Sequence, residues 1–173
     1  MATRRPEVRT NRLRFVLATA AFGLLLSACT ITISPMPNVQ ITLSDEITDF
    51  RPTRGVGSTY FVGDQIEFLL TTRSPGFVTL TAISPDGDVY ELSRNVRVPG
   101  GSVILPTREQ RVVYNAGPPR GVHRVRATFT TSPTSGTVVY RGRRGDAEWS
   151  AAIELELRTH DVRDVAETSL VVR

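Results

Sequence analysis

The sequence of 173 residues contains one cysteine, two histidines and no lysine. A single cysteine excludes an intrachain disulfide and any metal cluster held by several thiolates. A three-ligand zinc site would need carboxylates beside the histidines. No local cluster supplies them, so we expect no metal and no cofactor. The absence of lysine reflects genome composition more than chemistry.

Long hydrophobic runs are also absent. The longest apolar stretch covers residues 15–28, or 14 residues, whereas a membrane-spanning helix needs about 20. Five arginines precede this stretch between residues 4 and 14, and Leu26-Ser27-Ala28-Cys29 ends it. A basic start, a short apolar core and small residues before a cut site are typical of a signal peptide.

The Leu-Ser-Ala-Cys motif resembles the lipobox of bacterial lipoproteins. In that family the cysteine thiol receives a diacylglycerol and a peptidase cuts before it. The resemblance implies a signal peptide over residues 1–28, lipidation of Cys29, and anchoring of the mature chain to a membrane. Two alternatives stay open: an uncleaved short anchor, or an ordinary signal peptide followed by an incidental cysteine.

The leader also explains the high isoelectric point of about 10.0. It holds five of the 21 basic residues and one of the 17 acidic residues, so the rest of the chain has 16 of each sign. A nucleic-acid-binding domain keeps a basic excess on its folded part. We therefore expect no nucleic-acid partner.

Residues 29–38 follow the leader and include Pro35 and Pro37, which favour an extended tether. Thr30, and not aspartate, comes directly after the cysteine. In bacteria with two membranes, this resembles lipoproteins sent to the outer membrane. We expect the protein in the cell envelope, anchored by lipid, and in the outer membrane if its host has two membranes.

Residues 39–173 are predicted to form one β domain. Short segments with alternating or apolar patterns, separated by Gly and Pro, predict strands at residues 39–43, 65–72, 76–83, 88–92, 102–105, 111–114, 121–130, 147–157 and 169–172. Residues 45–58 are expected to form a loop, and residues 159–167 a short helical turn. The fold class is all-β: an antiparallel, Ig-like β-sandwich or an open barrel.

The two segments with the longest alternation are residues 121–130 and 147–157. Arg124 and Arg126 share one face of the first, and Glu148, Glu154 and Glu156 share one face of the second. If these segments are neighbouring strands, the arginines and glutamates pair across them.

A second resemblance rests on turn motifs. Tyr60-Phe61-Val62-Gly63-Asp64, then Gly76-Phe77-Val78, then Pro85-Asp86-Gly87, followed by Asn95 and Pro106, look like a bacterial domain-of-unknown-function family, the one numbered 4384. The resemblance covers about residues 60–130. It departs at Phe77, where tyrosine is usual, and at Arg94, where proline is usual.

This family implies a β-sandwich-like envelope module with no established catalytic residues. Within its first motif, we expect Gly63 to supply the bend and Asp64 to bond the amides of the turn.

No catalytic motif is present: there is no Gly-x-Ser-x-Gly elbow, phosphate-binding loop or His-Glu-x-x-His sequence. His123 is expected to be a hydrogen-bonded core residue. His160 and Asp161 are adjacent, and on an extended chain their side chains point to opposite faces. We expect no enzyme activity and no small-molecule substrate, with a hydrolase built from dispersed residues as the less favoured alternative.

Arg141, Arg143 and Arg144 form a cluster among glycines that is suited to binding phosphates or acidic polymers. The alternative is a solvated hairpin with no ligand.

Two functions are expected for the whole chain. The first is a scaffold or accessory subunit of an envelope protein complex, which binds its partner through an exposed sheet edge. The second is a binder of anionic polysaccharide or lipid headgroups.

Overall fold

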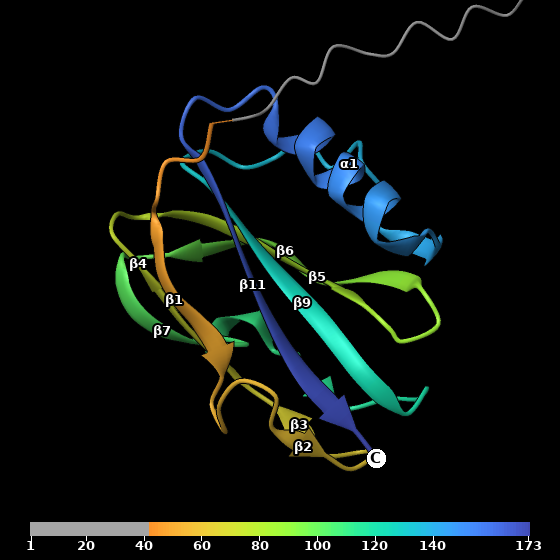
Figure 1. Cartoon of the computed structure of the whole chain (residues 1–173). Coiled ribbons are helices and arrows are strands. Elements are labelled where there is room, and N and C mark those ends of the chain that lie inside the picture. The colour runs from red at the N-terminus through yellow and green to blue at the C-terminus, as the bar shows by residue number, and fades with distance from the viewer. Residues whose placement is uncertain (1–41) are drawn as a thin grey trace, which may run out of the picture. The chain divides into compact units, whose positions relative to one another are not determined.

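The computed structural model describes residues 42–173. The predicted signal peptide, Cys29, the tether and most of the predicted strand at 39–43 lie outside this range. The described residues form two facing β-sheets, with one α-helix packed outside the larger sheet (Figure 1). This arrangement confirms the predicted all-β sandwich.

The small sheet has the strand order β1–β4–β7, and the large sheet has the order β10–β6–β5–β9–β11–β2. All neighbours are antiparallel except β11 and β2, which are parallel. The small sheet contains β1 (Ile47–Pro52), β4 (Phe68–Thr72) and β7 (Gly101–Leu105). The large sheet contains β10 (Arg141–Arg143), β6 (Asp88–Val98), β5 (Gly76–Ile83), β9 (Gly121–Thr130), β11 (Arg163–Val172) and β2 (Thr59–Tyr60). Three further elements are β3 (Gln65–Ile66) paired with β8 (Tyr114–Asn115), the 3₁₀-helix η1 (Arg108–Gln110) and the α-helix α1 (Gly145–Leu157).

One hydrophobic core fills the space between the two sheets. The small sheet contributes Phe68, Leu70 and Leu105, and the large sheet contributes Val78, Leu80, Phe129 and Leu170. Each side chain of this size stabilises the fold by about 1.5–3 kcal/mol when fully buried. The alternation of β9 places Val125, Ala127 and Phe129 in this core, as its sequence predicts.

β5 is buried on both faces because the core covers one face and α1 covers the other. Thr79 and Thr81, on the helix side, are only 2% and 0% exposed. At the start of β5, Gly76 lies under the ring of Phe129, where an added Cβ atom would come within 2.4 Å of the ring. Glycine is therefore the residue that fits the first position of this central strand.

One side of the sandwich is closed by contacts between β1 and β11. The backbone N–H of Ile47 donates to Asp164 Oδ2 at 2.7 Å, and the N–H of Ser44 donates to the carbonyl of Arg163 at 2.8 Å. On the other side, β6 and β7 are joined by only Pro99 and Gly100, yet they do not pair with each other. β6 pairs with β5 and β7 pairs with β4. The sandwich is therefore open between β6 and β7.

The prediction of a strand at residues 147–157 is wrong, because this segment is the helix α1. Its buried residues are Trp149, Ala152, Ile153, Glu156 and Leu157, which recur at the three- and four-residue spacing of a helix face. Alternating apolar residues had suggested a strand, but three of them, Ala147, Ala151 and Leu155, are exposed. The segment is also rich in Ala, Glu and Leu, which are strong helix formers.

The prediction that the arginines of residues 121–130 pair with the glutamates of residues 147–157 is also wrong. Arg126 pairs with Glu167 of β11 (Nε–Oε2, 2.6 Å), and Arg124 pairs with Asp146 at the start of α1 (Nη2–Oδ1, 2.5 Å). β11, and not the segment 147–157, is the true neighbour of β9. Arg126 also lies over the ring of Trp149, 4.0 Å from its centroid, so it connects the helix to the sheet.

Several element boundaries differ from the prediction. β1 occupies part of the segment expected to be a loop, and residues 42–44 are not in a strand. β6 extends to Val98, and β11 begins at Arg163 inside the expected helical turn. Residues 111–113 are not in a strand, because only Tyr114 and Asn115 pair with β3. In each case the pairing partner, which local sequence does not identify, decides where the strand begins and ends.

Candidate functional site

A groove of about 1300 Å³ lies between β6 and β7, on the open side of the sandwich. Residues 92–98 of β6 form one wall, and Val103 and Ile104 of β7 form the other, with Pro106–Gln110 and Val112 along the groove. Within residues 42–173, β7 pairs only with β4, and the part of β6 beyond Tyr90 pairs only with β5. Two strand edges with unpaired backbone groups therefore border the groove.

The groove exposes apolar side chains. Ile104 is 50% exposed and Val112 is 45% exposed. Polar side chains also line it, and two of them are joined through Tyr114: Gln110 Nε2 donates to the hydroxyl of Tyr114 at 3.3 Å, and that hydroxyl donates to Ser93 Oγ at 2.8 Å. The groove thus offers apolar contact and backbone hydrogen bonding in the same place.

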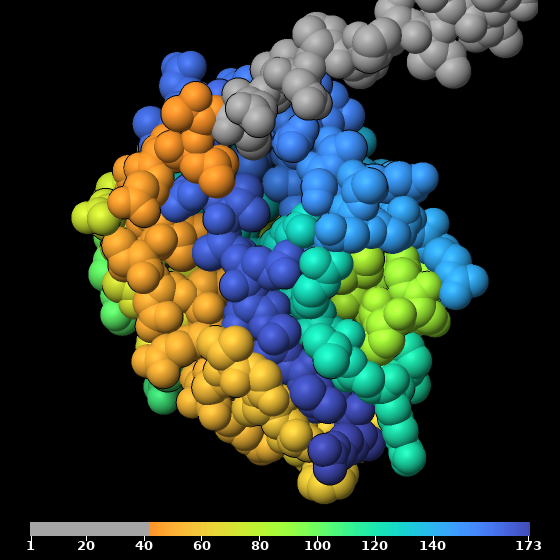
Figure 2. Space-filling view, in the orientation of Figure 1, coloured from red at the N-terminus to blue at the C-terminus, as the bar shows by residue number. Residues whose placement is uncertain are grey.

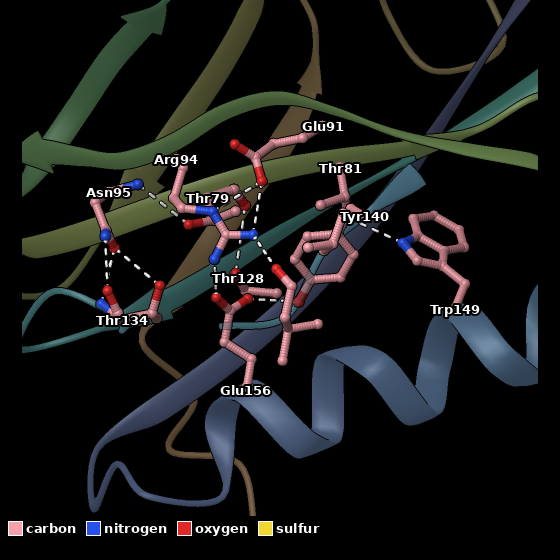
Figure 3. Close-up of polar contacts among 12 residues, drawn as sticks. Thr79, Thr81, Glu91, Arg94, Asn95, Thr128, Thr134, Tyr140, Trp149 and Glu156 are labelled. Carbon is pink, nitrogen blue, oxygen red and sulfur yellow. Dashed lines mark hydrogen bonds and ion pairs between the residues drawn. The ribbon is translucent and has the colours of Figure 1, made fainter. Parts of the chain in front are cut away.

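β6 is irregular where it borders the groove. Its register with β5 shifts on both sides of Leu80, and Asn95 has a positive φ of 53°. The Asn95 side chain binds the backbone of Thr134 twice, through Nδ2 to the carbonyl at 3.0 Å and through Oδ1 from the N–H at 2.9 Å (Figure 3). These bulges bend β6 away from a regular ladder and hold the segment after β9 against it.

A buried polar network connects β6 to α1 beside this bulge (Figure 3). The Glu156 carboxylate accepts hydrogen bonds from the Arg94 guanidinium and, at 2.5 Å, from the Tyr140 hydroxyl. Arg94 also binds Glu91 and the carbonyl of Val138. Burial, and then the hydrogen bond to Glu156, raise the pKa of Tyr140 well above its usual range. Each member is engaged within the network, which therefore acts as a structural clamp.

The arginine cluster lies at the edge of the large sheet and leads into α1. Arg141 and Arg143 are in β10, not in the hairpin that the sequence suggested, and Arg144 is the N-cap of α1. Arg143 Nε donates to the carbonyl of Asp86 at 2.8 Å, and Arg144 Nη2 donates to the carbonyl of Val139 at 3.2 Å. These bonds orient both side chains, and among the described residues no carboxylate forms an ion pair with any of the three arginines.

His123 is the predicted core histidine. It is 3% exposed, and its Nε2 and Nδ1 atoms bind the carbonyl of Pro119 at 2.7 Å and the hydroxyl of Tyr90 at 3.2 Å. Burial raises the pKa of Tyr90. Both ring nitrogens are occupied by structural partners, so this histidine is not available to a substrate.

His160 lies in a turn after α1, where its Nδ1 is 3.2 Å from Ser132 Oγ. In the described part of the chain, no carboxylate hydrogen-bonds to its ring, and Asp161 does not contact it by a hydrogen bond. A serine–histidine pair without an orienting acid lacks one component of a catalytic triad. Within residues 42–173, no group of three His, Cys, Asp or Glu residues is placed to hold a metal.

Asp64 has the predicted turn role. Its Oδ2 accepts the N–H of Phe61 and a guanidinium N–H of Arg54, both at 3.1 Å, and Gly63 has a φ of 96°. The backbone hydrogen bond from Phe61, and then the bond from Arg54, lower the pKa of Asp64. The motif residues thus build the turn itself.

Sequence reasoning did not identify the β6–β7 groove. Pro99, Gly100 and Gly101 predict a break between two strands, which is correct. A short connection usually joins two strands that pair, however, and here the strands enter different sheets. The groove depends on that choice of partners, and no local signal carries it.

Residues 59–133 match the family model described as Domain of unknown function (DUF4384). The match confirms the resemblance based on the turn motifs: this segment of the chain is similar to that family. It covers β2 to β9 and the groove, whereas β1, β10, α1 and β11 lie outside it. Comparisons with curated proteins and with solved structures found no match.

Proposed function

We propose that this protein is a membrane-anchored, non-catalytic lipoprotein of the cell envelope, and that it serves as a scaffold or accessory subunit of an envelope protein complex. The lipobox-like sequence ending at Cys29 supports the anchor. The observation that carries the binding role is the groove between the unpaired edges of β6 and β7. A segment of the partner protein adds to an edge as an extra strand, with its apolar side chains against Ile104 and Val112.

The chemistry of the groove supports a protein partner over a small ligand. The groove runs between two strands, which suits an extended chain, and its edges supply the alternating N–H and C=O groups that a new strand needs. The charged residues that line it, Arg94, Arg97, Arg108, Glu67 and Glu109, include both signs. Backbone pairing and apolar contact, and not a net charge, therefore dominate the binding.

The test is cross-linking in living cells. A photo-cross-linking residue at Val112 is expected to capture one or two proteins in stoichiometric amounts. Ile104→Asp places a charge in the groove and is expected to abolish this capture. Leu155→Asp is the matched control, because Leu155 is a half-exposed apolar side chain on α1, outside the groove. Equal capture by both variants, or no captured protein, would contradict the scaffold function.

A second candidate function is binding of anionic polysaccharide or lipid headgroups, favoured by the orientation of the Arg143 and Arg144 side chains by backbone carbonyls. Replacement of Arg141, Arg143 and Arg144 by serine separates the two functions. Polymer binding should weaken and lose its salt dependence, whereas capture through Val112 should be unchanged. Labelling of Ser132 by a reactive-serine probe would instead favour a hydrolase.

A further inference from the structure

The large sheet has two different ends. Ser44 and Arg163 lie at one end, where the described chain begins. The other end, which we call the far end, is formed by the β5–β6 turn at residues 84–87, the start of β9 and the end of β11. β11 runs the full length between them. Its ten residues rise about 3.3 Å each, so the two ends are about 33 Å apart.

An apolar turn projects from the far end. Phe61 is 64% exposed and Val62 is 51% exposed, directly after β2, and Val122 at the start of β9 is 54% exposed. In Figure 2 the gold atoms around residue 60 protrude at the bottom of the molecule, beside the end of the blue strand β11. Exposed aromatic and aliphatic side chains grouped at one place on a soluble surface mark an interaction site.

The backbone of this turn is held in place. The N–H of Val62 donates to the carbonyl of Arg173 at 3.2 Å, the N–H of Gly63 donates to the carbonyl of Ala116 at 2.8 Å, and Asp64 closes the turn by accepting the N–H of Phe61. Phe61 and Val62 are therefore presented outward by a fixed structure, and their exposure does not result from a loose loop.

Arginines surround the apolar turn. Arg54 lies over the Tyr60 ring with 53% of its side chain exposed, and it binds Asp64. Arg120 and Arg173 are exposed and are the chain neighbours of the last paired residues of β9 and β11, Gly121 and Val172, at the far end. The cluster Arg141, Arg143 and Arg144 lies at the opposite edge of the same end. Five strand spacings separate β10 from β2, which is about 24 Å.

The acidic residues at the far end offset only some of these arginines. Asp64 already binds Arg54 and the Phe61 amide, and Asp146 binds Arg124 and Arg126. Asp86 and Asp88 remain exposed in and beside the β5–β6 turn. The far end therefore carries a basic excess on a domain with a balanced overall charge.

We propose that the far end docks onto an anionic membrane surface. Phe61 and Val62 enter the boundary between headgroups and acyl chains, and the surrounding arginines bind headgroup phosphates. Guanidinium groups suit this role because each donates two N–H groups to one phosphate. A protruding turn fits a soft lipid surface, whereas a protein partner would need a matching pocket.

The length of the tether permits this orientation, and this step rests on the proposed lipid anchor. Twelve residues lie between Cys29 and Thr42, and the thirteen Cα–Cα steps between these two residues reach at most about 45 Å. The large sheet is about 33 Å long between its ends. A chain anchored at Cys29 can therefore lie with its far end on the same membrane, which leaves the β6–β7 groove free for a partner.

The test uses the full-length chain reconstituted into vesicles of phosphatidylglycerol and phosphatidylcholine. Phe61→Trp places a fluorescent reporter in the turn, and the native Trp149 is 0% exposed and supplies a constant background. Lipids brominated on their acyl chains are expected to quench the tryptophan introduced at position 61. Leu155→Trp is the control at a half-exposed site on α1, and its emission should be retained.

Removal of phosphatidylglycerol, or replacement of Arg141, Arg143 and Arg144 by serine, should reduce the quenching at position 61. The proposal is overturned if position 61 is quenched no more than position 155 in anionic vesicles. It is also overturned if an added envelope protein protects the tryptophan at position 61 from a quencher dissolved in the water, while brominated lipid leaves its emission unchanged. A failure of anchoring is seen separately, because every variant would then fail to float with the vesicles.

Discussion

Arg94 on β6 and Glu156 on α1 form an ion pair between residues 62 positions apart in the chain. The Glu156 side chain is only 2% exposed, and the Arg94 side chain is 18% exposed. Arg94 lies inside the segment that matches the family model, whereas Glu156 lies outside it. This pair therefore connects the family segment to the helix that follows it.

Loss of Arg94 should destabilise the protein strongly. Arg94→Leu leaves the Glu156 carboxylate buried without its cationic partner, and we expect a loss of about 3–5 kcal/mol in the free energy of unfolding. The double variant Arg94→Leu/Glu156→Leu should recover most of this loss, because it removes the uncompensated charge as well. Urea denaturation of the three proteins measures both effects.

The control for this prediction is Arg97→Leu, an exposed arginine on the same strand, which should change the stability by no more than about 0.5 kcal/mol. A loss below about 1 kcal/mol for Arg94→Leu would show that the buried ion pair is not what fastens α1 to the sheet.

The family segment by itself should not fold. A chain that ends at residue 133 lacks β11, which pairs with β9 along ten residues, and also lacks Leu170, Val172 and Trp149 from the two cores. Each of these side chains stabilises the fold by about 1.5–3 kcal/mol. We expect a chain of residues 42–173 to give a near-ultraviolet circular dichroism signal and slowly exchanging amides. A chain of residues 42–133 should show neither. Protected amides in the shorter chain would contradict this prediction.

Gly76 should not tolerate a side chain. The Cβ atom of Gly76→Ala would approach the Phe129 ring to 2.4 Å and the carbonyl of Thr130 to 2.7 Å. Overpacking of this kind typically costs about 1–3 kcal/mol. Gly117→Ala is the matched control, since nothing lies within 4 Å of its added Cβ atom. Thermal unfolding should give a lower Tm for Gly76→Ala only.

The turn at residues 61–64 should give the protein an acid-sensitive component of stability. The pKa of Asp64 is lowered from 3.8, first by the backbone hydrogen bond from Phe61 and then by Arg54. A depressed carboxyl pKa stabilises the folded state above the unfolded pKa, and this stabilisation is lost as the pH falls through the folded pKa. The stability difference between the wild type and Asp64→Asn should therefore be constant near neutral pH and shrink below about pH 4.

Asp64→Asn is informative because it keeps an oxygen acceptor for the Phe61 amide but cannot ionise. Urea unfolding from pH 7 to pH 2 measures the difference. A difference that does not change over this range would mean that the charge of Asp64 does not support the turn.

Cys29→Ser should abolish attachment of the protein to lipid. Serine cannot accept the thioether-linked diacylglycerol, so we expect the variant in the soluble fraction after cell lysis or retained with its uncleaved leader. Metabolic labelling with a radioactive fatty acid should mark the wild type and not the variant. Equal labelling of the two proteins would exclude Cys29 as the lipidation site.

The candidate site divides into a part that the sequence identifies and a part that it does not. The three arginines of the cluster were recognised as a charged group, but their places in β10 and at the N-cap of α1 were not. The groove residues Ile104 and Val112 gave no signal, because apolar residues in a strand pattern are usually buried. Their exposure results from the separation of β6 and β7 into different sheets.

The sequence by itself determined the strands β5 and β9, the turn at Ser84–Gly87 and the turn at residues 61–64, because alternation and turn chemistry depend on neighbours along the chain. Only the tertiary structure decided that residues 147–157 form a helix, since their apolar residues fit both periods and packing against Thr81 and Val165 selects one. Tertiary structure also decided which sheet each strand joins. That choice depends on pairing between distant segments, so it alone produced the open edge between β6 and β7.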